Sequence, residues 1–71
     1  MSGLKIIKAL GKAGFTVVGR KGSHVRLKKK TAQSINIVIV PVHAEIKRGT
    51  LKSILRQAGL TVDDLERLLK E

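Results

Sequence analysis

The feature that most restricts the fold is a strict alternation of residue types along Ser23–Lys28. Successive side chains of a β-strand point to opposite faces of a sheet, so a period of two predicts a strand with one buried face. The buried face is expected to carry Val25 and Leu27, and the solvent face to carry His24, Arg26 and Lys28. His24 is therefore expected to point away from the core.

Two further strands are predicted around this one. Phe15–Arg20 is rich in β-branched residues, and Lys21-Gly22 supplies a hairpin turn because Gly22 has no Cβ and permits tight turns or close ligand approach. After a polar turn over residues 30–34, Ile35–Val40 is the strongest strand pattern of the chain. We expect the strand to end at Pro41, which has no N–H. Its core-facing residues are expected to be Ile35, Ile37 and Ile39.

Helical spacing of apolar residues predicts helices on both sides of these strands. Gly3–Ala13 follows Ser2 as an N-cap, Thr50–Ala58 stops at Gly59, and Thr61 caps a last helical segment. The order predicts an α+β fold in one domain of residues 1–71: a helix, a three-stranded antiparallel sheet, then one long or two short helices. The helices are expected to cover one face of the sheet and leave the other open.

The charge is large and unevenly distributed. The net charge is +10, residues 1–30 contain no Asp or Glu, and most acidic residues lie near the C-terminus. Such a field attracts polyanions. Lys5, Lys8 and Lys12 form a stripe on the first helix; a solvated face is one interpretation, and contact with phosphates is the one we favour.

Composition excludes several kinds of site. The chain has no cysteine, only two histidines and few carboxylates, so we expect neither a metal site nor a cofactor. Phe15 is the only aromatic residue, which disfavours base stacking on rings. No apolar run approaches a membrane span and no signal peptide is recognisable, so we expect a soluble, cytoplasmic protein without membrane contact.

Four short segments, in order and at matching spacing, resemble the HicA (YcfA-like) toxins of HicAB toxin–antitoxin systems. They are Gly14-Phe15, Arg20–His24, Ile39–His43, and Gly49–Leu55 followed by Ala58-Gly59. The resemblance implies a fold like the double-stranded RNA-binding domain, an mRNA-cleaving activity and a HicB-type antitoxin as partner. The functional histidine of the family lies in a Gly-Ser-His step, which is His24 here. A preference for particular RNA bases does not carry over from the resemblance.

Cleavage of RNA without metal requires a base for the 2′-hydroxyl, positive charge near the phosphorane oxygens and an acid for the leaving oxygen. His24 is the candidate acid or base, because an imidazole can accept and donate a proton near neutral pH. His43 is a second candidate for proton transfer; the alternative is a structural histidine that hydrogen-bonds loop backbone. The candidate RNA contacts near His24 are Lys21, Gly22, Ser23, Arg26 and Lys28.

Other functions remain open at this point. The same basic face suits a module that binds double-stranded RNA without cutting it. It also suits an adaptor for an acidic protein, and the antitoxin can use the same surface. Direct DNA binding is not expected, because the helix predicted at Thr50–Ala58 places its apolar residues in the core and is not a polar recognition helix.

Overall fold

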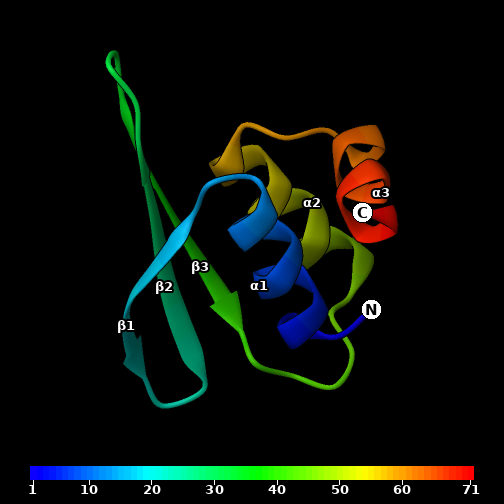
Figure 1. The fold of residues 1–71 in the computed structure, drawn as a ribbon. Helices are drawn as coiled ribbons and strands as arrows, with labels where there is room; N and C mark the ends of the chain where they lie inside the picture. Colours follow the sequence, from blue (N-terminus) through cyan, green and yellow to red (C-terminus); the bar gives the residue numbers. More distant parts are fainter.

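The computed structural model describes residues 1–71 and shows helices packed against one face of a sheet (Figure 1). The elements in chain order are α1 (Gly3–Lys12), β1 (Thr16–Lys21), β2 (His24–Lys30), β3 (Ile35–Pro41), α2 (Arg48–Ala58) and α3 (Val62–Lys70). The predicted α+β arrangement is confirmed, and its C-terminal part consists of two helices. None of the helices has the length and apolar character that crossing a bilayer requires.

The sheet is an antiparallel meander in the order β1-β2-β3. Lys21 pairs with His24, so Gly22 and Ser23 form a two-residue hairpin turn. Gly22 has φ +59° and Ser23 has a negative φ, which is the pattern of a type II′ turn with glycine at its first central position. The β1–β2 ladder is irregular between Val17 and Gly19, where β1 carries a bulge.

The core lies between the sheet and the helices. Val25 and Leu27 of β2 are buried, as the alternation predicts, and they pack with Ile6 and Leu10 of α1 and with Ile54 of α2. Burial of a side chain of this size contributes about 1.5–3 kcal/mol to folding. The central strand is therefore held by its aliphatic face, and its basic face stays in solvent.

The expectation that Ile35, Ile37 and Ile39 face the core is wrong. Their side chains are 55%, 52% and 44% exposed, whereas Val38 and Val40 are fully buried. The strand Ile35–Val40 has aliphatic residues on both faces, so periodicity alone does not choose between them. The pairing with β2 makes the choice.

That pairing sets aliphatic residues opposite one another. Val40 lies opposite Val25, and Val38 lies opposite Leu27. Directly opposite residues of an antiparallel pair share a face, so both valines join the core. A shift of β3 by one residue against β2 would move Val38 and Val40 to the open face and bring the isoleucines of β3 to the core face. Asn36, on the valine side, donates its Nδ2 to the Gln57 carbonyl of α2 at 3.4 Å.

The helix α3 packs on α1, on the side of the helices away from the sheet (Figure 1). Leu65 is buried in a small cluster with Ala9 of α1 and Leu55 of α2. Lys12 Nζ donates to the Leu68 carbonyl at 3.1 Å and also to the Glu71 carbonyl, near the end of α3. A cation at a helix C-terminus donates hydrogen bonds to the last carbonyls, which have no partner within the helix, and interacts favourably with the helix dipole.

A capping box begins α3, as Thr61 predicts. The Thr61 hydroxyl accepts from the Asp64 N–H at 3.1 Å, and the Asp64 carboxylate accepts from the Thr61 N–H at 2.9 Å. Arg67 pairs with the same carboxylate. The backbone hydrogen bond from Thr61, together with its side chain and Arg67, holds the pKa of Asp64 below its ordinary value of 3.8.

Two neighbouring threonine substitutions test the face assignment of β3. Ile37→Thr keeps a β-branched side chain on the exposed face, so it should change the free energy of unfolding by no more than about 0.5 kcal/mol. Val38→Thr places an unpartnered hydroxyl in the core and should cost about 1–3 kcal/mol. Urea unfolding followed by circular dichroism measures both. The reverse ranking would show that the isoleucines form the core.

The lowered pKa of Asp64 predicts a pH-dependent contribution to stability. The contribution is present above the ordinary pKa and is lost as pH falls through the lower folded-state pKa. Asp64→Asn should therefore have a lower Tm than the parent at neutral pH, and the difference should shrink below about pH 4. Thermal melts over a pH series measure it. Asp63→Asn is the matched control, because Asp63 makes no hydrogen bond or ion pair; a gap for Asp64→Asn that is constant with pH would contradict the linkage.

Candidate functional site

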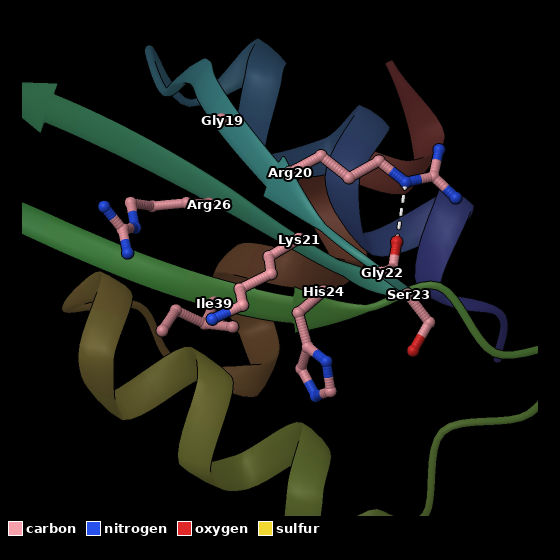
Figure 2. Close-up of a pocket in the computed structure, with 8 residues that line it drawn as sticks. All are labelled: Gly19, Arg20, Lys21, Gly22, Ser23, His24, Arg26 and Ile39. Atoms are coloured by element: carbon pink, nitrogen blue, oxygen red, sulfur yellow. Dashed lines mark hydrogen bonds between the residues drawn. The ribbon is translucent and has the colours of Figure 1, made fainter.

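A hollow of about 710 Å³ lies at the β1–β2 turn and extends along the face of the sheet that the helices leave uncovered (Figure 2). Backbone or side-chain atoms of eight residues line it: Gly19, Arg20, Lys21, Gly22, Ser23, His24, Arg26 and Ile39. All three strands contribute, so the meander itself builds the hollow.

The cross-strand register explains which side chains meet there. Lys21 lies opposite His24, Gly19 opposite Arg26, and Arg26 opposite Ile39. Figure 2 shows Lys21, His24 and Ile39 projecting to the same side of the sheet. His24 is exposed, as predicted. A solvent-accessible imidazole therefore lies among cations on the uncovered face.

Arg20 belongs to the other side. It pairs with Val25, whose side chain is in the core, and Figure 2 shows its side chain pointing away from His24. Its Nε donates to the Gly22 carbonyl at 3.0 Å. Arg20 therefore stabilises the hairpin turn from the side opposite His24.

The turn is also held by the segment that follows β3, at the same end of the sheet. The Ser23 carbonyl accepts a hydrogen bond of 2.6 Å from the Val42 N–H, immediately after β3. This contact ties the Gly22-Ser23 turn to the loop that carries His43. The Ser23 side chain is exposed beside His24 (Figure 2).

The cations of the hollow have no acidic partner. The two ion pairs of the structure join the N-terminus to Glu45 and Arg67 to Asp64, both away from the hollow. Lys21 and Arg26 are exposed and keep their positive charge available for an anion. Phosphate oxygens are suitable anions, because guanidinium and ammonium groups bind them by charge-assisted hydrogen bonds. No three His, Cys, Asp or Glu side chains gather as metal ligands.

The structure brings some of the predicted binding residues together and separates others. Lys28 lies on the same face as Arg26, opposite Ile37, but outside the hollow and nearer the tip of the β2–β3 hairpin. Lys5 and Lys8 are exposed on α1, in the helical layer, and do not line the hollow. The Lys12 ammonium is hydrogen-bonded to a carbonyl near the end of α3. The three lysines of α1 therefore do not form one surface with His24.

His43 is exposed and does not line the hollow. Its carbonyl accepts from the Gly3 N–H at 2.9 Å, at the start of α1. A side chain at position 3 would collide with the Pro41 carbonyl, so glycine permits this close approach. The backbone of His43 thus connects α1 to the end of β3.

Gly19 and Ile39 were not among the predicted site residues. The sequence pattern predicts Ile39 in the core and Gly19 within a strand. The signal that identifies them is the cross-strand register, which places both beside Arg26. Register depends on the three-dimensional pairing and cannot be read from either strand alone.

A family model described as the HicA toxin of bacterial toxin–antitoxin matches residues 3–60. The chain belongs to this family. The match runs from α1 to the end of α2 and does not include α3. A search of curated proteins returned no match. As a HicA toxin, the chain is the toxin of a toxin–antitoxin system and has an antitoxin partner.

The two glycines of the HicA site should differ in their tolerance of a side chain. Gly22→Ala places a Cβ on a left-handed backbone and should cost about 1–2 kcal/mol. Gly19→Ala is the matched control, because its φ is not positive and a Cβ there meets no atom within 4 Å. It should be neutral or slightly stabilising. Urea unfolding measures both, and equal costs would contradict the turn assignment.

Proposed function

We propose that this HicA toxin is an endoribonuclease that cleaves mRNA, with His24 as general acid or base. The observation that carries the proposal is the exposed His24 imidazole in a hollow lined by unpaired cations on the uncovered sheet face. Membership of the HicA toxin family supports it, because the residues around His24 lie within the matched region.

The cleavage step follows from the groups present. His24 accepts the proton of a ribose 2′-hydroxyl, the 2′-oxygen attacks the adjacent phosphorus, and the bond to the 5′-oxygen breaks. The leaving 5′-oxygen takes a proton, and the other product carries a 2′,3′-cyclic phosphate. A base within hydrogen-bond reach contributes about 10²- to 10⁴-fold to such a step. Each group in this scheme belongs to the RNA or to the protein, and none requires a metal.

The cations and the turn backbone stabilise the charge that develops on the phosphorane. Lys21 and Arg26 flank His24 across the strands, so they can contact the same phosphate. The Gly22 N–H and the Ser23 hydroxyl are donors at the turn beside them. Lys28 extends the track of positive charge along β2 to a neighbouring phosphate. Lys5 and Lys8 would contact only a more distant part of a long RNA.

The loop that carries His43 bears on the second proton transfer. His43 lies one residue after Val42, which is hydrogen-bonded to Ser23, so its loop is attached to the site although its ring does not line the hollow. We propose a water molecule or His43 as the group that completes proton transfer. The two assignments differ in what removal of His43 does to the rate.

A HicB-type antitoxin is the proposed protein partner on the same face. The row of His24, Arg26 and Lys28 lies next to a row of exposed isoleucines on β3. A partner with acidic and apolar groups matches both rows, and its binding would exclude RNA from the hollow. Opposite charges would also accelerate association.

Removal of the imidazole tests the activity. We expect His24→Ala to keep the circular dichroism spectrum and the RNA affinity, because His24 is exposed and the cations remain. Its cleavage rate on labelled mRNA in EDTA should fall by about 10²- to 10⁴-fold. Toxicity on expression should fall with it. His43→Ala distinguishes the two candidates for the second proton transfer, with cleavage retained if water completes it and reduced if His43 does.

Two results would contradict the proposal in different ways. Equal cleavage by His24→Ala and the parent would remove His24 from the mechanism. Binding of RNA by the parent without any fragments would favour the alternative function, a module that holds double-stranded RNA through shape and phosphate contacts.

A further inference from the structure

The hollow beside His24 is larger and less uniformly polar than a phosphate site needs to be. Its volume of about 710 Å³ lies within the range of about 300–1,000 Å³ for sites that enclose small organic ligands. Contact with a phosphate requires only the donors of Lys21, Arg26 and the turn. The remaining space is available for another part of the nucleotide.

One wall of the hollow is apolar. Ile39 is the hydrophobic residue among those lining it, and its side chain is 44% exposed (Figure 2). It lies directly opposite Arg26 in the ladder. An isoleucine offers nothing to a phosphate, but it matches the flat, weakly hydrated face of a nucleobase. A guanidinium beside it can stack on the same base.

No exposed Phe, Tyr or Trp ring is available for this purpose. Phe15 is the only aromatic residue, and it is 5% exposed in the core. Because the proposed function assigns the His24 imidazole to the sugar-phosphate, stacking on a base falls to Arg26 and Ile39.

Gly19 keeps the space beside Arg26 open. It lies opposite Arg26, on the other side from Ile39, and a Cβ there would meet no atom within 4 Å. Its φ is not positive, so the backbone does not demand glycine. The absence of a side chain at Gly19 therefore enlarges the hollow.

We propose that this hollow is a nucleobase subsite, in which one unstacked base of single-stranded RNA lies against Arg26 and Ile39 in the space left by Gly19. The inference rests on the proposed function, since His24 then faces the sugar-phosphate attached to that base. A duplex cannot occupy the subsite, because its bases are paired and stacked. The substrate class of this site is therefore single-stranded RNA.

Binding experiments with the His24→Ala protein test the subsite without cleavage. The probes are a short single-stranded oligoribonucleotide, the same strand with abasic nucleotides throughout, and the same strand annealed to its complement. The normal strand should bind about 5- to 150-fold more tightly than the abasic strand, which corresponds to the stacking of one base. The duplex should bind at the abasic level.

Filling the hollow should abolish that preference. Gly19→Leu in the same background should lower the affinity for the normal strand to that for the abasic strand, which should itself be unchanged. Gly11→Leu is the matched control, because a Cβ at Gly11 also meets no atom within 4 Å but lies on α1, outside the hollow. Ile39→Thr provides a second variant if Gly19→Leu does not fold, and it should weaken the same preference.

The results separate this inference from the proposed function. Equal affinity for the normal and abasic strands, or for the strand and its duplex, would overturn the subsite. Full preference retained in folded Gly19→Leu or Ile39→Thr would also overturn it. Cleavage of mRNA by the parent protein is scored independently, so either proposal can fail while the other stands.

Discussion

The pairing of aliphatic residues between β2 and β3 is the constraint on which the rest of the structure depends. Val25 against Val40 and Leu27 against Val38 form the part of the sheet that the helices cover. Burying this face is favourable, and burying the basic face of β2 is prohibitive. Burial of Val25 and Leu27 therefore decides which way His24 points, because side chains alternate along the strand.

The uncovered face combines two chemical properties as a result. The cations of β2 alternate with its core residues, and the exposed isoleucines of β3 lie directly opposite them. A row of cations and a row of apolar side chains are thus adjacent on the sheet itself, without the help of a loop or an insertion. This suits a ligand that is anionic along one edge and flat and apolar along the other, as a single-stranded nucleic acid is.

Acidic and basic side chains also lie on different sides of the molecule. Four of the five acidic residues lie within residues 63–71, in α3 and at its end, on the side of the helices away from the sheet (Figure 1). Of these, Asp64 pairs with Arg67 and forms the cap of α3, and the Lys12 ammonium is hydrogen-bonded to carbonyls near the end of the helix. The positive charges around His24 are consequently not neutralised by their own chain, and the field on the sheet face remains attractive to RNA.

Local patterns in the sequence determined the elements of this protein. Alternation placed β2 and the exposure of His24, helical spacing and caps placed the helices, and Gly22 placed the hairpin turn, because each depends on residues close together in the chain. Only the tertiary structure decided the face of β3, the use of Lys12 by α3, and the position of Gly19 and Ile39 beside Arg26. These depend on pairing register and on packing between segments that are distant in the chain. Ile35–Val40 has two aliphatic faces, so its sequence does not select the buried one. The sequence around Lys12 likewise does not indicate that its ammonium contacts α3.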